Sequence, residues 1–172
     1  YVLTVAHCIV RCWKKEEIVR LGEFNVMTNV DCLNHEEYGN KCSEPVKDYS
    51  IEEVKVHEGY IHSAAAPKDI ALVRLSRDVE YSDFIRPVCL PTAKEVDLNL
   101  GVELTSSGWG TGFTEKPPVV IKKKFTVWLR PVDECNKLKI IQTSHRRVTD
   151  DHHCVGSKSA ILLNATARAE VR

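Results

Sequence analysis

The chain has no long apolar run, and this absence already excludes one class of protein. A transmembrane helix needs about 18 or more consecutive apolar residues, and no such stretch occurs. The chain also has no charge excess, because 24 Lys and Arg residues balance 24 Asp and Glu residues. A globally basic nucleic-acid binder and an acidic tail protein are therefore both excluded. We predict neither a membrane partner nor a nucleic-acid partner.

No secretory leader is visible, since the chain opens on Tyr1 without a basic segment followed by an apolar one. We expect this start to be internal to a longer protein. Repeats, heptads and low-complexity tracts are also missing, and the single charge run, Lys122 to Lys124, is typical of a solvated strand end or loop. With 172 residues, 43% of them hydrophobic, the chain is expected to form one globular domain with a core.

Cysteine, in contrast, is abundant, and its density favours disulfide bonds in an oxidising compartment. We therefore expect a secreted, extracellular protein. An odd count leaves at least one cysteine free, bonded to another chain, or separated from a partner outside this one. The alternative is a zinc module, built on His7, Cys8 and Cys12 or on His152 to Cys154, but no Cys-x-x-Cys pair is present. The seven are Cys8, Cys12, Cys32, Cys42, Cys89, Cys135 and Cys154.

The apolar residues come in strand-length bursts separated by turn-forming Gly, Pro, Asn and Asp, which predicts an all-β fold of short strands and long loops. Residues 29–48 are predicted to be a polar surface loop and 91–101 a connection between two halves. Many short strands with a midpoint linker favour two barrels or sandwiches. A short helix is expected over 133–141. The predicted strands are 2–5, 18–21, 54–56, 70–75, 102–105 and 125–129.

Three motifs carry candidate chemistry. His7, in Thr-Val-Ala-His-Cys, follows an apolar strand, and histidine is the side chain best suited to exchange protons near neutral pH. Asp69 directly precedes the apolar strand 70–75, where it could cap a turn or orient an imidazole. The glycines of Ser-Ser-Gly-Trp-Gly-Thr-Gly at 106–112 permit close backbone approach. Each motif alone also has a purely structural explanation, as a strand end or a turn.

Taken together with Arg-Pro-Val-Cys-Leu-Pro at 86–91, these motifs resemble the trypsin/chymotrypsin serine proteases over residues 1 to about 158. Arg-Leu-Gly-Glu-Phe at 20–24, with the cysteine pair at 32 and 42, most resembles arthropod clip-domain proteases. The resemblance implies two antiparallel Greek-key β-barrels, both incomplete here, with the active site in the cleft between them. Residues 1–90 would form most of the first barrel, 91–101 the connection, 102–158 part of the second barrel, and 159–172 a divergent tail.

The resemblance also implies roles for single residues. His7 would be the general base, and Asp69 would hold its tautomer and stabilise the imidazolium. The implied disulfides are Cys32–Cys42 and Cys135–Cys154. Cys8 matches a cysteine whose partner lies upstream, Cys89 one that tethers an N-terminal clip prodomain, and Cys12 has no match.

No cofactor is required by this chemistry, but a calcium ion is an open possibility. Relatives bind calcium with hard oxygen ligands in the loop after Glu23. Acidic surface loops are also common without any ion. The candidate ligands in this loop are Glu23, Asn25, Asp31, Glu36 and Glu37.

The resemblance breaks at the nucleophile. The family's serine sits in Gly-Asp-Ser-Gly-Gly, roughly a dozen residues after the cysteine matching Cys154, and residues 155–172 contain no such motif. Ser157 and Ser159 lack the glycine-rich surroundings of an oxyanion hole. We therefore expect the 172-residue chain not to cleave peptide bonds.

A frameshift or a misplaced exon end would explain the tail, and a real loss of the serine is the other hypothesis. One register over, codons for residues 165–167 can spell Asp-Ser, and those for 169–172 can spell Gly-Gly-Gly-Pro. Under a frameshift, the Asn-Ala-Thr sequon at 164–166 is accidental. Under a real loss, it is a candidate glycan site.

Two functions follow from these observations. The first is a secreted serine endopeptidase, made as a zymogen, that cleaves polypeptides after Arg or Lys in an extracellular cascade through a serine outside these 172 residues. The second is a non-catalytic homologue that acts as a binding or regulatory partner in such a cascade. The missing serine motif favours the second, and the presence of His7 and Asp69 weighs only weakly against it.

Overall fold

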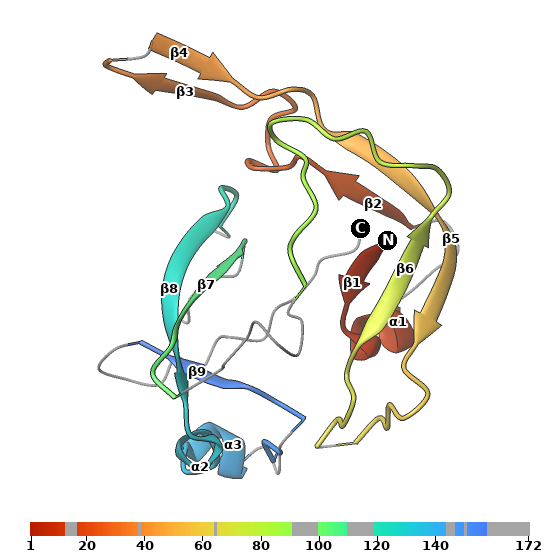
Figure 1. Ribbon diagram of the computed structural model, residues 1–172, viewed down its shortest axis with the longest axis vertical. Helices are drawn as coiled ribbons and strands as arrows, with labels where there is room; N and C mark the ends of the chain where they lie inside the picture. Colours follow the sequence, from red (N-terminus) through yellow and green to blue (C-terminus); the bar gives the residue numbers. More distant parts are fainter. Residues whose placement is uncertain are drawn as a thin grey trace.

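The computed structural model describes residues 1–12, 17–37, 39–63, 65–90, 100–109, 119–143, 147–149 and 151–157. Strands dominate these residues and the helices are short, which confirms the predicted all-β class (Figure 1). None of the helices in the described parts has the length and apolarity that crossing a bilayer requires. The strands are β1 Val2–Thr4, β2 Ile18–Leu21, β3 Cys32–His35, β4 Gly39–Cys42, β5 Lys47–Val56, β6 Ala71–Leu75, β7 Glu103–Gly108, β8 Lys123–Arg130 and β9 Cys154–Gly156. The helices are α1 Ala6–Cys12, α2 Val132–Asn136 and α3 Lys139–Thr143.

The first half of the chain forms a four-stranded antiparallel sheet in the order β1-β6-β5-β2, curled like half a barrel (Figure 1). Its core follows from strict alternation along β6, whose residues are buried and exposed in turn. Val73 on β6 and Tyr49 on β5 are completely buried, and Ala6 and Ile9 of α1 pack against the same cluster. The core thereby fixes the junction between β1 and α1.

The second half forms a three-stranded antiparallel sheet in the order β7-β8-β9. Val127 and Leu129 on β8 face inward and are buried. The helix predicted over 133–141 is instead split into α2 and α3. The split occurs because the chain tightens after α2, where the Leu138 N–H donates to the Cys135 carbonyl at 3.1 Å in a three-residue step.

The stretch predicted as a polar loop over 29–48 contains a hairpin and the first residues of β5. Cys32 and Cys42 face each other in register across β3 and β4, and a disulfide joins them. The residues of β4 are all exposed, and the hairpin projects away from both sheets (Figure 1). The apolar alternation that marks a half-buried strand is missing here because neither face of the hairpin packs on a core.

Hydrogen bonds to backbone groups join the two halves near residue 24. The Phe24 carbonyl accepts from the Lys122 N–H at 2.8 Å and from Trp109 Nε1 at 2.9 Å, and the Val26 N–H donates to the Val120 carbonyl at 3.0 Å. The Lys122 ammonium lies 4.5 Å from the centre of the Trp109 ring, and its burial there lowers the pKa of Lys122. Trp109 of the glycine-rich motif therefore has a structural role, whereas residues 110–112 lie outside the described part of the chain.

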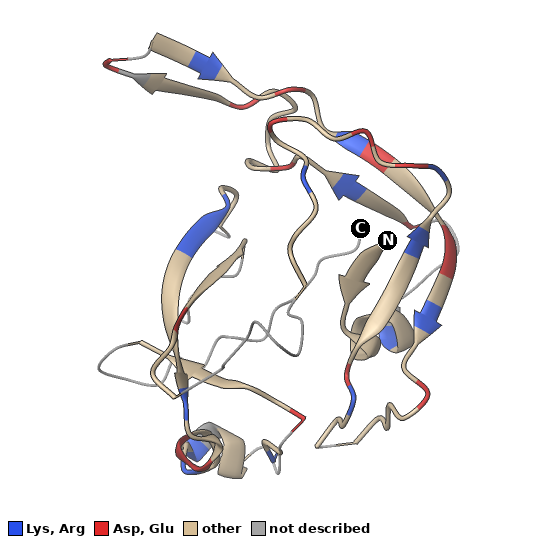
Figure 2. Cartoon of the chain, viewed as in Figure 1, with Lys and Arg blue, Asp and Glu red and all other residues tan. Residues whose placement is uncertain are grey.

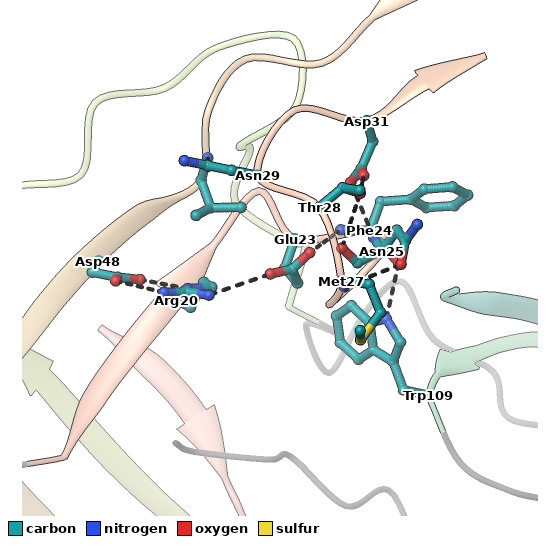
Figure 3. A network of polar contacts seen from close by, with 11 residues as sticks. Arg20, Glu23, Phe24, Asn25, Met27, Thr28, Asn29, Asp31, Asp48 and Trp109 are labelled. Atoms are coloured by element: carbon teal, nitrogen blue, oxygen red, sulfur yellow. Dashed lines mark hydrogen bonds and ion pairs between the residues drawn. The ribbon is translucent and has the colours of Figure 1, made fainter. Parts of the chain in front are cut away.

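An ion pair bridges β2 and β5, where Arg20 and Asp48 are cross-strand partners. The guanidinium donates to both carboxylate oxygens, at 2.7 and 2.8 Å (Figure 3). Hydrogen bonding to Arg20 lowers the pKa of Asp48, with desolvation opposing it. Acidic and basic residues are interspersed along the first sheet (Figure 2).

We expect Asp48→Asn to reduce the free energy of unfolding by about 0.5 kcal/mol at pH 7, because both side chains of the pair are more than a third exposed and solvent screens them. A carboxyl with a depressed pKa stabilises the fold above its unfolded pKa of about 4, and this contribution is lost as the pH falls through the folded value. Urea denaturation at pH 7 and at about pH 2 tests this. Equal deficits at the two pH values would contradict it.

Candidate active site

His7 and Asp69 lie 62 residues apart in sequence but are brought together by the first sheet. β1 and β6 run antiparallel with Thr4 opposite Ala71. The end of β1 is therefore the neighbour of the start of β6. His7 follows β1 in the first turn of α1, and Asp69 lies in the turn that leads into β6.

The Asp69 carboxylate holds His7 with two bonds. Its Oδ1 accepts from the His7 backbone N–H at 2.8 Å, and its Oδ2 lies 2.6 Å from His7 Nδ1. Because the carboxylate accepts, the imidazole carries its proton on Nδ1, and Nε2 is the proton acceptor of the ring. The side chains are only 34% and 19% exposed, so water competes weakly for these bonds. The arrangement can take a proton at Nε2 and stabilise the imidazolium that results.

A second polar group, which the sequence analysis missed, lies beside this pair. The Arg11 guanidinium donates to His62 Nε2 at 3.0 Å, so His62 Nδ1 donates to the Tyr60 hydroxyl oxygen at 3.1 Å. Burial first, and then the charge of Asp69, raise the pKa of Tyr60. No spacing or motif distinguishes these residues in the sequence, because Arg11 lies 51 positions from His62.

An open pocket of about 530 Å³ lies on the Asp69 side of the pair. Its wall includes Thr4 on β1, Lys68 and Asp69 from the turn before β6, and Asp151 from the segment before β9. Both halves of the chain therefore contribute to it.

The structure forms the two disulfides that the resemblance implies within the chain, Cys32–Cys42 and Cys135–Cys154. The second joins α2 to β9 and is buried. Cys89 is an exposed thiol, and Cys8 is half-buried in α1 beside His7. The side chain of Cys12 lies outside the described part of the structure.

The loop after Glu23 is organised by its own hydrogen bonds (Figure 3). The Asp31 carboxylate accepts from the Asn25 N–H at 3.0 Å and from the Thr28 hydroxyl. Glu23 accepts from the Phe24 N–H at 3.1 Å and lies 3.6 Å from Arg20. These two candidate calcium ligands are therefore already partnered.

Glu36 and Glu37, the other acidic candidates, lie in the turn of the β3–β4 hairpin. Across the described ranges, no three His, Cys, Asp or Glu side chains are grouped to hold a metal ion. Each ligand set of the zinc alternative has one member with another partner, because His7 is hydrogen-bonded to Asp69 and Cys154 is disulfide-bonded to Cys135.

Comparison with known proteins identifies the family. The family model described as Trypsin matches residues 1–161. The chain is 39% identical to Melanization protease 1 of Drosophila melanogaster over 169 residues, covering 94% of this chain and 41% of that protein. It is 36% identical to the CLIP domain-containing serine protease HP8 of Bombyx mori, covering 91% of this chain and 42% of that protein.

A solved structure agrees with these sequence matches. The crystal structure of the Drosophila Grass clip serine protease of the Toll pathway matches with a TM-score of 0.70 and 31% identity, covering 90% of this chain and 42% of that one. The chain thus spans about two fifths of the length of the relatives that it matches. It belongs to the trypsin family of serine proteases, with clip-domain proteases among its relatives.

Proposed function

We propose that the chain carries the general base and its orienting carboxylate in a secreted serine endopeptidase whose nucleophile lies outside these 172 residues. One observation carries the proposal. The Asp69 carboxylate binds His7 twice, at its backbone N–H and at Nδ1, and so fixes both the ring and its tautomer. Side chains alone supply this chemistry, and trypsin-like proteases generally need no cofactor.

In the proposed reaction, His7 Nε2 takes the proton of the serine hydroxyl as the serine oxygen attacks the scissile carbonyl carbon. The same proton then passes to the leaving amine, and the carbon–nitrogen bond breaks to leave an acyl-enzyme. Water, deprotonated by His7 in turn, attacks the acyl carbon, and the serine oxygen leaves with the proton that His7 returns, which releases the acid product. Asp69 stays ionised throughout and stabilises the imidazolium.

We propose that the substrates are polypeptides cleaved after Arg or Lys in an extracellular cascade. The relatives are named for melanization, clip domains and the Toll pathway, which supports such a setting. The exposed thiol of Cys89 supports a tether to an upstream clip prodomain, because an accessible cysteine can pair with one outside the described residues. The two disulfides support secretion.

A non-catalytic homologue that binds other members of a cascade is the second candidate. The observation that favours it is the absence of Gly-Asp-Ser-Gly-Gly from residues 155–172. Under this alternative, the His7–Asp69 pair is a retained structural feature and the protein acts through its surface.

We expect the 172-residue chain to remain unlabelled by a fluorophosphonate probe, because no serine in it lies in the Gly-Asp-Ser-Gly-Gly motif of the family's nucleophile. The transcript through the codons for residues 155–172 and beyond should also be sequenced. If a shifted register restores Gly-Asp-Ser-Gly-Gly, the protein translated in that register should be labelled stoichiometrically. Labelling of the 172-residue chain itself would contradict the proposal, and a message that encodes this tail would favour the non-catalytic homologue.

A further inference from the structure

The residue immediately before Asp69 has an unusual backbone conformation. Lys68 has a φ of 56°, in the left-handed region that residues other than glycine rarely occupy. The Ile70 N–H donates to the Lys68 carbonyl at 2.7 Å, which closes a three-residue turn with Asp69 at its centre. The place of the Asp69 carboxylate therefore depends on the conformation of Lys68.

The side chain of Lys68 reaches from this turn to the other half of the chain. Its stem crosses the turn at Gly59, where a Cβ would lie 3.4 Å from Lys68 Cγ. Its ammonium pairs with the carboxylate of Asp151, which is 83 residues away in sequence and lies just before β9. The two segments lie at the same end of the molecule (Figure 1).

Asp151 is presented by a firmly anchored segment. Three residues later, Cys154 is bonded covalently to Cys135 of α2. On the other side of Asp151, the Thr149 carbonyl accepts from the His152 N–H at 3.0 Å. The Asn136 side chain also bonds both backbone groups of Val148 at 2.9 Å. The anchored segment thus holds the Asp151 carboxylate in place, and the Lys68 ammonium binds to it.

We propose that Lys68 and Asp151 are positioning residues for the His7–Asp69 pair. The ion pair holds Lys68 in its left-handed conformation, and the turn in that conformation places the Asp69 carboxylate against His7 Nδ1. The second half of the chain thereby controls the geometry of a base that belongs to the first half. The functional meaning of this control rests on the proposed protease function, but the geometry can be tested without any cleavage assay.

The test is proton NMR of the 172-residue chain, following the low-field resonance of the His7 Nδ1 proton and its exchange with water. The resonance is assigned by its loss in His7→Gln. We expect Asp151→Asn and Lys68→Met each to speed exchange about threefold, because the carboxylate is then held less firmly and the lost ion pair is partly screened by solvent. Lys68→Arg, which preserves the charge, should restore the slow exchange. Lys47→Met is the matched control, since it breaks the Lys47–Glu80 pair of 2.9 Å on the same sheet and should change nothing.

Wild-type exchange in both Asp151→Asn and Lys68→Met would overturn the proposal. A change in Lys68→Met alone would also overturn it, because the effect would then come from the turn itself and not from the ion pair. Absence of the resonance in the wild-type chain would overturn the His7–Asp69 pairing, and with it the proposed function. Failure of the positioning role and failure of the proposed function are therefore distinguishable. Asp151→Asn is isosteric and removes no buried group, so loss of folding does not obscure the result.

Discussion

Asp69→Asn is expected to lower kcat of the proposed full-length protease about 10⁴-fold with little change in KM. The Asp69 carboxylate accepts hydrogen bonds from two His7 groups, one of them at 2.6 Å on Nδ1. An amide in its place presents a donor to the ring, so the imidazole is held in the opposite tautomer and Nε2 can no longer take a proton. Substrate binding does not involve this contact. Steady-state kinetics on a peptide ending in Arg, using the protein that carries Gly-Asp-Ser-Gly-Gly, measures the loss.

The matched control for this experiment is Asp48→Asn. It makes the same chemical change at an exposed carboxylate that pairs with Arg20 across β2 and β5, so kcat should stay at the wild-type value. A loss of less than about tenfold in Asp69→Asn would show that this carboxylate does not orient the base. A comparable loss in both variants would indicate a general effect on folding.

Removal of the Cys135–Cys154 disulfide is the second large effect. We expect the double variant Cys135→Ala/Cys154→Ala to lose about 3 kcal/mol of unfolding free energy, because the bond closes a loop with a sequence separation of 19 residues. Both cysteines are buried, at 9% and 1% exposure, so the loss of packing adds to the loss of the constraint. Denaturant unfolding of the oxidised wild type and the variant provides the measurement.

The Cys32–Cys42 disulfide offers the comparison within the same chain. Its hairpin is exposed and projects from the body of the molecule, so it can open without unfolding the sheets (Figure 1). Cys32→Ala/Cys42→Ala should therefore change global unfolding by less than about 1 kcal/mol, despite its similar chemistry. Equal losses in the two double variants would show that the hairpin unfolds together with the rest of the chain.

The sequence predicted β2 and β6, which bury apolar residues, and missed the exposed hairpin β3–β4 and the short helix α1. β2 was predicted with its observed bounds, and β6 to within one residue, because their β-branched residues lie between turn signals. The hairpin β3–β4 was missed because its residues are polar on both faces. Helix α1, with seven residues, is too short for an apolar period to appear.

The residues of the candidate site could be predicted from the sequence only in part. His7 and Asp69 could be named from motifs, but the two bonds between them depend on the register that places Thr4 opposite Ala71. The contact between Lys68 and Asp151 joins residues 83 apart, and no local pattern encodes such a distance. The calcium loop offered suitable oxygen ligands in sequence, yet Glu23 and Asp31 are committed to neighbours within the loop.

The register of β1 on β6 also determines what the His7–Asp69 pair can report about the state of the protein. Because His7 and Asp69 both extend from adjacent ends of these strands, their pairing reports on the integrity of one sheet. It does not report on competence for hydrolysis, which needs atoms from elsewhere. The pair is thus a spectroscopic marker of a correctly folded first half.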